Sequence, residues 1–150
     1  MKNILCTLIL LAAISAQSAD KKPVKVFILA GQSNMEGKGK VDPLLNHQIH
    51  APETKEYFAH LHKDGKYIER EDVWINFLNR RGRLTVGFGS PGRIGPELEF
   101  GHVVGDHYEE PVLIIKTAWG GKSIGRDFRP PSSGLPPKEE LDEAVNNLVN

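Results

Sequence analysis

Two continuous apolar runs constrain the fold of this 150-residue chain more than any other feature of its sequence. They span Val26 to Leu29 and Val112 to Ile115, and both consist of residues that favour β-strands. A strand with one solvated face alternates apolar and polar residues, whereas a strand covered on both faces of a parallel sheet is apolar throughout. The runs therefore predict two buried parallel strands, the first over Val24 to Ala30, joined by a right-handed crossover.

A helix is predicted before the second run. Pro96 suits the first turn of a helix, and Glu97 and Glu99 follow it where the helix dipole favours acidic side chains. We expect the helix to end near Tyr108, which makes the crossover of the α/β type. The inward-facing stripe of this helix consists of Leu98, Val103 and Val104.

Other segments are predicted from turn residues and periodicity. Residues 57–78 surround Asp64-Gly65, a pair favoured in tight hairpin turns, and their mixed charges suit an exposed ribbon outside the main sheet. Leu84 to Phe88 is a further short β-like run, and residues 35–45 are a loop with one helical turn. After a proline-rich loop over 129–137, residues 138–150 are predicted as a helix because apolar residues recur at helical spacing, namely Leu141, Val145 and Leu148.

The first apolar run leads directly into a turn that contains Ser33. Ala30 and Gly31 allow the backbone to turn sharply, so Ser33 lies just past the carboxyl end of the predicted strand. Ligands of open α/β sheets bind at this edge, which is where a nucleophile is expected. A lone Gly-x-Ser is more often a helix N-cap or a turn, so this motif needs companions to indicate catalysis.

Three sequence blocks together resemble a known superfamily. GQSNM at 31–35, GPELEFG at 95–101 and TAWGGKSI at 117–124 occur in the order found in SGNH hydrolases, in the variant carried by sialate O-acetylesterase-like proteins and acetylxylan esterases. The resemblance implies a three-layer, flavodoxin-like α/β fold with a parallel central sheet. It also implies a serine esterase, without a cofactor or metal, that removes O-acetyl groups from carbohydrates of the sialic acid or xylan type.

The same resemblance implies the residues of the site. Ser33 is implied as the nucleophile that forms an acyl-enzyme and as one backbone donor to the oxyanion, with Gly121, or else Gly120, as the second donor. Helix capping explains Glu97 at least as well as a direct role in the site does. Packing likewise explains Trp119 as well as contact with a substrate does. The residues implied to bind substrate or to support the nucleophile loop are Gln32, Asn34, Glu97 and Trp119.

One part of the family pattern is missing. Relatives complete the triad with an Asp-x-x-His pair and the oxyanion hole with a third block, and neither occurs in these 150 residues. We expect both to lie beyond residue 150, so that residues 20–150 are the amino-terminal part of an SGNH-type esterase domain, truncated at its carboxyl end. The alternative is a non-catalytic carbohydrate-binding or pseudo-enzyme module of the same fold. We interpret each histidine as structural or solvated: His47, His50, His60, His62, His102 and His107.

The first 19 residues are predicted to be a secretory signal peptide. Lys2 supplies a positive start, Ile4 to Ile14 is apolar but too short to span a bilayer, and small residues follow for cleavage. The protein is therefore expected to be exported, either to a periplasm or out of the cell, and not to remain at a membrane. Cys6 lies inside the apolar stretch rather than after it, which disfavours a lipoprotein anchor, and its removal leaves no cysteine for disulfides.

Charge and spacing disfavour other functions. The 19 acidic and 19 basic residues give no net charge, so nucleic acid and anionic membranes are not expected partners and a neutral substrate is the default. The family resemblance implies that this partner is an acetylated carbohydrate. Residues 120–123 imitate the end of a Walker A motif, but Lys116 stands where its first glycine is required. Gly87, Gly89 and Gly92 match a dinucleotide fingerprint, but nearby prolines delay the helix that would receive the pyrophosphate.

Overall fold

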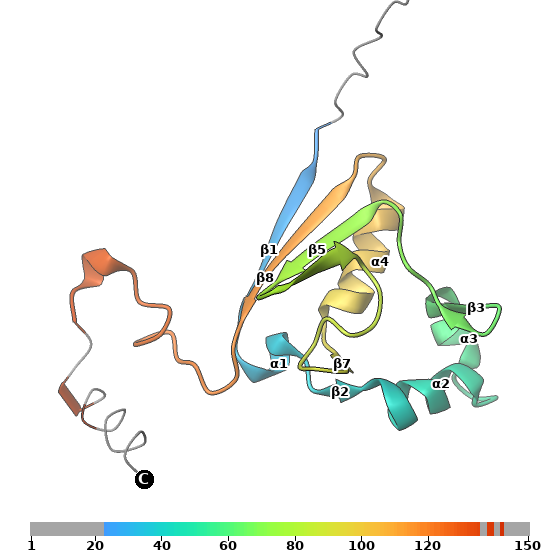
Figure 1. The fold of residues 1–150 in the computed structure, drawn as a ribbon, viewed down its shortest axis with the longest axis horizontal. Coiled ribbons are helices and arrows are strands. Elements are labelled where there is room, and N and C mark those ends of the chain that lie inside the picture. The colour runs from blue at the N-terminus through green and yellow to red at the C-terminus, as the bar shows by residue number, and fades with distance from the viewer. Residues whose placement is uncertain (1–22, 136–137, 140–141, 143–150) are drawn as a thin grey trace, which may run out of the picture.

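The main sheet has four strands, of which three are parallel (Figure 1). The computed structural model describes residues 23–135, 138–139 and 142. The strands, in spatial order, are β1 (Lys25–Gly31), β8 (Val112–Ala118), β5 (Val73–Phe77) and β6 (Arg80–Arg83). β8 pairs in parallel with both β1 and β5, and β6 is antiparallel to β5. This arrangement confirms the predicted α/β fold with a parallel central sheet.

One long helix, α4 (Glu97–His107), precedes β8 and packs on the sheet. Its limits agree with the prediction, but its inward face differs, because Val103 is 58% exposed. Two glycines face inward in its place. A Cβ atom on Gly101 would lie 2.0 Å from a methyl carbon of Leu84, and one on Gly105 would lie 2.5 Å from the Arg70 guanidinium. The helix therefore approaches the sheet more closely than any side chain at these positions would allow.

The prediction of a hairpin outside the sheet over residues 57–78 is wrong for its second half. Only β3 (His62–Lys63) and β4 (Lys66–Tyr67) form a hairpin around Asp64-Gly65, whereas β5 is an interior strand of the main sheet. The alternation along β5 is real, but it separates two faces of the main sheet: one contains buried Val73, Ile75 and Phe77, and the other contains Trp74 and Asn76.

The β-like run over Leu84 to Phe88 is also not a strand. The strand at this edge is β6, which comes earlier in the chain and contains three arginines. Leu84 is fully buried in the core, and its backbone N–H donates to the Val73 carbonyl. The apolar run reflects the burial of Leu84 at the end of the sheet, and the chain then turns at Gly87, where φ is +99°.

Shorter elements complete the described part. One of the two small two-stranded sheets is the β3–β4 hairpin. The other lies beside the carboxyl edge of the main sheet, and several short helices lie beside that edge and around the hairpin (Figure 1). The elements are α1 (Ser33–Glu36), β2 (Gly39–Lys40), the irregular helical segment η1 (Val41–Leu45), α2 (Asn46–His50), α3 (Lys55–Phe58), η2 (Ala59–Leu61), β7 (Arg93–Ile94) and η3 (Pro131–Ser133). None of the helices described is long and apolar enough to cross a bilayer.

The core lies between α4 and one face of the sheet. Its fully buried members are on β5 and β8 and in the segment after β6, and aromatic side chains of β1 and α4 pack against them. Phe27 and Phe100 make an edge-to-face contact there, with ring centroids 5.2 Å apart. The predicted signal peptide over 1–19 and most of the predicted helix over 138–150 lie outside the described residues.

Candidate active site

Ser33 lies in a tight turn between β1 and α1. The strand ends at Gly31, and Ser33 is the first residue of the helix. A Cβ atom on Gly31 would lie 2.8 Å from the Met35 Cβ, so the turn depends on this glycine. The Gln32 side-chain oxygen accepts from the Ser33 hydroxyl at 3.2 Å and from its backbone N–H at 3.4 Å. Ser33 is half-buried and lies at the carboxyl end of its strand, as predicted, but β1 is the edge strand of the described sheet rather than a central one.

The carboxylate of Glu36, at the end of α1, binds the loop that follows β8. It accepts hydrogen bonds from the Gly120 backbone N–H at 2.6 Å and from the Ser90 hydroxyl at 2.7 Å, and pairs with the Lys38 ammonium at 3.0 Å. The Ser90 hydrogen bond and then Lys38 lower the pKa of Glu36 below its usual value, so the group is held as a carboxylate. The nucleophile turn and the glycine loop are thereby connected directly.

This contact distinguishes the two glycines predicted as oxyanion donors. The Gly120 N–H already donates to Glu36, so it is not available to a substrate. Gly121 adopts a φ of +72° and, within the described residues, its N–H has no hydrogen-bond partner. The Trp119 N–H donates to the Gly31 carbonyl at 3.2 Å, which keeps the two loops side by side. Of the pair, Gly121 is the one that this geometry leaves open.

A fully buried ion pair lies beneath the turn. The Lys116 ammonium is 2.5 Å from the Glu97 carboxylate, and it also donates to the carbonyls of Glu36 and Phe88, each at 2.9 Å. An ammonium has three protons, so these three acceptors satisfy it completely. Burial is the largest influence on Lys116 and lowers its pKa, opposed by the hydrogen bond that its ammonium donates to Glu97. Lys116 thus joins α1, the loop before β7 and the start of α4.

Glu97 cannot touch a substrate in this arrangement, because its side chain is inaccessible to solvent. Its second contact is with its own segment, since it accepts from the Gly95 backbone N–H at 2.9 Å. Gly95 in turn packs against Gly37, where an added Cβ atom would lie 2.5 Å from the Gly95 Cα. The backbone just after the first sequence block therefore meets the backbone of the second block, and Glu97 has a supporting position.

The sequence analysis missed Lys116, Glu36 and Ser90 as parts of this arrangement. Lys116 offered a signal: it is the one charged residue in a mostly apolar strand, and a buried ammonium requires an acidic partner. The partner, Glu97, was a candidate for a different reason. Glu36 and Ser90 carry no comparable signal, because the atoms they join are 84 and 54 positions apart in the chain.

Two predicted residues, Trp119 and Asn34, do not line the hollow that lies beside the turn. Trp119 is 41% exposed, and its ring lies 5.7 Å from that of Phe128. Asn34 is exposed on α1. The hollow has a volume of about 240 Å³ and is lined by Ala30, Gly31, Gln32, Lys122, Ile124 and Phe128. The tryptophan is therefore not a core residue in the described structure, and it is open to a ligand.

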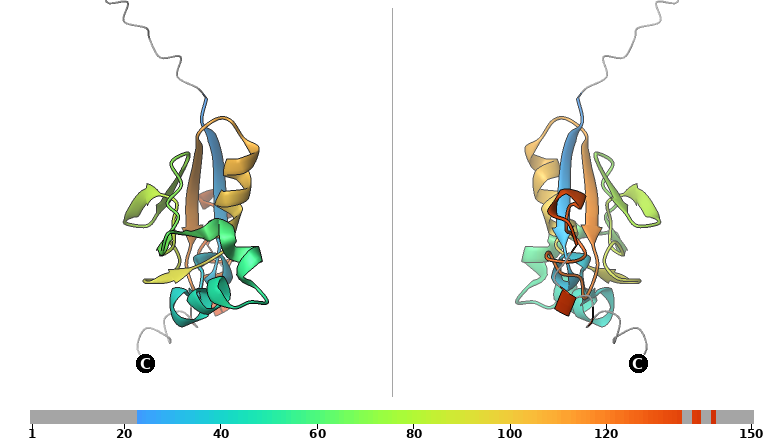
Figure 2. Two further views of the ribbon diagram at one scale, coloured as in Figure 1. Left: turned by 90° about the vertical axis from the view of Figure 1, so that its right-hand side faces the viewer. Right: turned by 90° about the vertical axis from the view of Figure 1, so that its left-hand side faces the viewer.

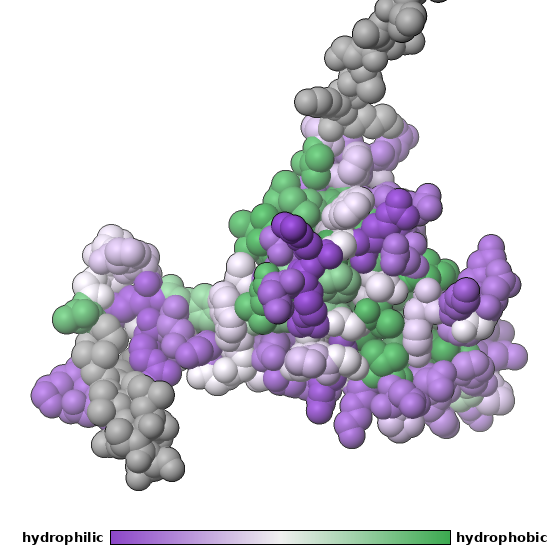
Figure 3. Space-filling view, viewed as in Figure 1, coloured by the Kyte–Doolittle hydropathy of each residue, from purple (hydrophilic) through white to green (hydrophobic). Residues whose placement is uncertain are grey.

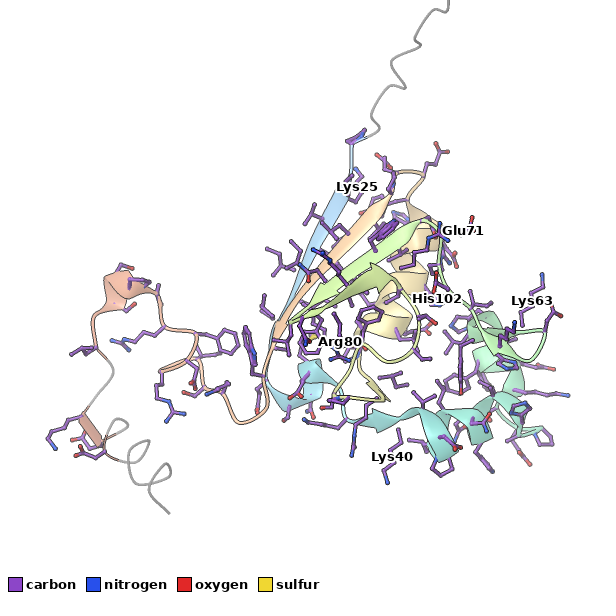
Figure 4. All side chains as sticks on the ribbon, in the orientation of Figure 1. Lys25, Lys40, Lys63, Glu71, Arg80 and His102 are labelled. Carbon is purple, nitrogen blue, oxygen red and sulfur yellow. The ribbon has the colours of Figure 1, made fainter. Side chains whose placement is uncertain are left out.

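All six histidines are among the described residues, and none of them forms a hydrogen bond with Ser33. His102 is buried on α4, its Nε2 has no partner, and its ring lies 5.3 Å from that of His60. His60 pairs with Glu99 at 2.7 Å. Figure 4 shows His102 on the side of α4 near the β3–β4 hairpin, and Arg80 beside the loop before β7, where it donates to the carbonyls of Gly87 and Gly89. The described residues contain no His, Cys, Asp and Glu cluster suited to a metal.

Comparison with known proteins decides the family. The sequence model of the family described as a carbohydrate esterase, sialic acid-specific acetylesterase, matches residues 23–148. The chain belongs to this family. Membership confirms the resemblance seen in the sequence and supports a carbohydrate acetylesterase, which is a carboxylic ester hydrolase. No curated protein and no solved structure shows a significant match to the chain.

Proposed function

We propose that this member of the sialic acid-specific acetylesterase family removes O-acetyl groups from carbohydrates through an acyl-enzyme on Ser33. The observation that carries the proposal is the nucleophile turn. Ser33 is half-buried at the carboxyl end of β1, and the turn that holds it is fixed from below by Lys116 and from the side by Glu36. Fixed geometry of this kind is what nucleophilic catalysis requires.

In the proposed reaction, the Ser33 hydroxyl oxygen attacks the acetyl carbonyl carbon while a base takes the hydroxyl proton. The carbonyl oxygen becomes an oxyanion and accepts hydrogen bonds from the backbone N–H groups of Ser33 and Gly121. The Ser33 N–H is only weakly engaged by Gln32, at 3.4 Å, so an oxyanion can replace that contact. The C–O bond to the sugar breaks, the sugar oxygen takes the proton, and water then hydrolyses the acetyl-serine to acetate.

Lys116 and Glu97 act here as positioning residues. Lys116 holds the carbonyl of Glu36, the last residue of the four-residue helix that begins with Ser33. Glu36 in turn holds Gly120, next to the open donor Gly121. One chain of contacts therefore fixes the distance between the nucleophile and the second donor. Neither Lys116 nor Glu97 is accessible to the substrate.

Trp119 is proposed to contact the sugar. Its exposed ring lies 5.7 Å from that of Phe128, which lines the hollow beside the turn, and an aromatic face of this kind packs against the apolar face of a pyranose. Lys122, which lines the same hollow, pairs with Asp127 at 3.1 Å and adds a polar group at its rim. The carboxylate of sialic acid needs a cation of this kind to pair with. A neutral sugar such as xylose does not.

The second candidate is a binding module without catalysis. One observation favours it: the Ser33 hydroxyl donates to the neutral Gln32 amide, and no basic side chain of the described residues accepts from it. Without a base the serine stays protonated, and general-base assistance contributes about 10²–10⁴-fold to such reactions. Acetylated sugar would then bind beside Trp119 without turnover.

The experiment separates the two candidates. Acetate release from acetylated sialic acid and from acetylated xylan is measured with the wild type and with Ser33→Ala, with and without added imidazole as an external base. Imidazole-dependent release that Ser33→Ala abolishes supports the nucleophile and shows that the base is the missing component. Calorimetric binding with no Ser33-dependent release under either condition overturns the esterase and supports the binding module.

The predicted cellular location and signal peptide stay proposals. We infer that the protein is exported and that residues 1–19 are removed during export. The mass of the protein recovered outside the cytoplasm tests this directly. A mass that includes the first 19 residues contradicts it.

A further inference from the structure

Ser90 has a buried hydroxyl that contacts two charged side chains following Ser33 in the chain. It donates to the Glu36 carboxylate at 2.7 Å and accepts from the Lys38 ammonium at 2.8 Å. A hydroxyl has one proton and two lone pairs, so it can bind a carboxylate and an ammonium at the same time. Ser90 is only 8% exposed and does not line the hollow beside the turn. The proposed reaction gives it no contact with a substrate.

The loop that contains Ser90 is fixed by two cations from the main sheet. Of the three consecutive carbonyls of residues 87–89, the outer two accept from the Arg80 guanidinium and the middle one accepts from the Lys116 ammonium. Both cations also lie over the Phe77 ring, at 5.0 and 4.6 Å from its centroid. Figure 4 shows Arg80 beside this loop. The backbone next to Ser90 is therefore bound from the sheet at every carbonyl.

The same loop lies at the end of the sheet that contains the nucleophile turn. It leads from β6 through β7 to α4, which covers one face of the sheet (Figure 2). The Ser90 N–H donates to the Gly37 carbonyl at 2.9 Å, so the loop is joined to the residue that follows α1. In Figure 3, hydrophobic residues gather over β1, whereas residues of intermediate or hydrophilic character cover its carboxyl end. The Ser90 hydroxyl thus has a fixed position in a polar region beside the turn.

The Glu36 carboxylate lies close to the proposed oxyanion donors and must be kept in one place. Its Oε2 accepts from the Gly120 N–H at 2.6 Å and lies 3.0 Å from the Lys38 ammonium, while its Oε1 accepts from the Ser90 hydroxyl. A carboxylate that turned away from Gly120 could bind the open N–H of Gly121 and would repel a developing oxyanion there. Hydrogen bonds at both oxygens prevent this rotation.

We propose that Ser90, held in place by Arg80, is a positioning residue whose hydroxyl keeps the Glu36 carboxylate on Gly120 and so reserves Gly121 for the oxyanion. The inference rests on the proposed Ser33 chemistry and adds to it a residue that the substrate does not reach. Without the hydroxyl, Oε1 of Glu36 loses its hydrogen bond and the carboxylate is free to turn. The electrostatics agree with the geometry, because the Ser90 hydrogen bond is the largest cause of the lowered pKa of Glu36.

The Gly120 amide proton reports this contact without any turnover. Because the Gly120 N–H donates to Glu36, its NMR chemical shift in the full chain follows the protonation of that carboxylate. In Ser90→Ala we expect the midpoint of this titration to rise by about half a pH unit or more, since a hydrogen bond that favours the carboxylate is lost. Thr54→Val is the matched control, because it removes a hydroxyl hydrogen bond of the same length, 2.7 Å, between α2 and α3. An unchanged midpoint in Ser90→Ala, or an equal rise in both variants, would overturn the proposal.

Acetate release in the presence of imidazole tests the consequence for catalysis. Ser90→Ala is expected to lower the Ser33-dependent kcat about tenfold and to leave KM within about twofold, because oxyanion contacts act in the transition state. Thr54→Val should change neither constant. In a Glu36→Ala background, Ser90→Ala should have no further effect, since Ser90 acts through Glu36. Full additivity of the two substitutions, or a change confined to KM, would contradict this role.

Arg80→Lys keeps the test decisive if Ser90→Ala does not fold. Lysine retains the charge but does not bridge two carbonyls, so the loop should shift and the Gly120 midpoint should rise as in Ser90→Ala. Arg81→Lys, at the next and exposed position of β6, is its control and should leave the midpoint unchanged. An unchanged midpoint in Arg80→Lys would contradict the proposal. A wild type that lacks Ser33-dependent release contradicts the esterase function instead, and the Gly120 titration still decides whether Ser90 holds the carboxylate.

Discussion

The two faces of the main sheet have similar side chains but different neighbours. Along β8, Val112 and Ile114 are buried beneath α4, while Leu113 and Ile115 alternate with them on the opposite face of the sheet, which we call the open face. The covered face also contains Lys116, whose ammonium is fully satisfied below the nucleophile turn. The comparison shows that the run of apolar residues specifies two burial surfaces, and that the site is built at the carboxyl end of the covered one.

The largest expected effect is on the covered face, at Lys116. Lys116→Met leaves the Glu97 carboxylate buried without its partner, which is expected to cost about 3–5 kcal/mol of unfolding free energy. Urea unfolding followed by circular dichroism measures the loss. The control is the adjacent open-face substitution Thr117→Val, which removes no side-chain hydrogen bond or ion pair among the described residues.

The double variant tests the cause. Adding Glu97→Gln to Lys116→Met removes the unpaired charge, so at least half of the lost stability should return. If the double variant is as unstable as the single one, the ion pair is not the source of the effect. Lys116→Arg is expected to fold but to displace α1, so it should reduce Ser33-dependent acetate release more than it changes substrate affinity.

The next prediction compares the same residue type on both faces. Ile114→Ala removes a fully buried side chain and is expected to cost about 2–5 kcal/mol. Ile28→Ala, on the neighbouring strand, is expected to cost about 1 kcal/mol. Denaturant midpoints of the two variants give the difference. Equal losses would show that the open face is covered as completely as the other.

How far the sequence predicted this structure depends on whether a feature is local. β1, β8, α4 and the Ser33 turn follow from short patterns, such as an apolar run that ends in Gly31. β5 was missed because the alternation of Trp74 and Asn76 with apolar residues is the same for an exposed ribbon and for a sheet covered on one face. A local pattern does not say which surface covers a strand.

Only part of the site was predicted, because its other features depend on contacts between residues far apart in the chain. The glycine loop and the nucleophile turn were placed at one edge by strand order, and their meeting is visible in the contact between Glu36 and Gly120. The choice of Gly121 as the open donor depends on that contact, which joins residues 84 positions apart. Lys116 acquires its role only from three acceptors that come from three separate segments.

A smaller effect is expected in the middle of α4, at His102. His102 is buried, and desolvation is the main cause that lowers its pKa below 6.5, with Arg70 and His60 acting in the same direction and Glu99 and Asp106 opposing. A base with a lowered folded pKa binds fewer protons when folded, so stability is present above pH 6.5 and is lost as the pH falls toward the folded pKa.

Unfolding free energy measured between pH 7 and pH 5 checks the sign. The contribution of one proton is at most about 1.4 kcal/mol per pH unit. His102→Phe removes the titrating group and should flatten the profile in this window, whereas His107→Phe, at the exposed end of the same helix, should leave it unchanged. A steeper profile for His102→Phe would mean that His102 is charged in the folded protein.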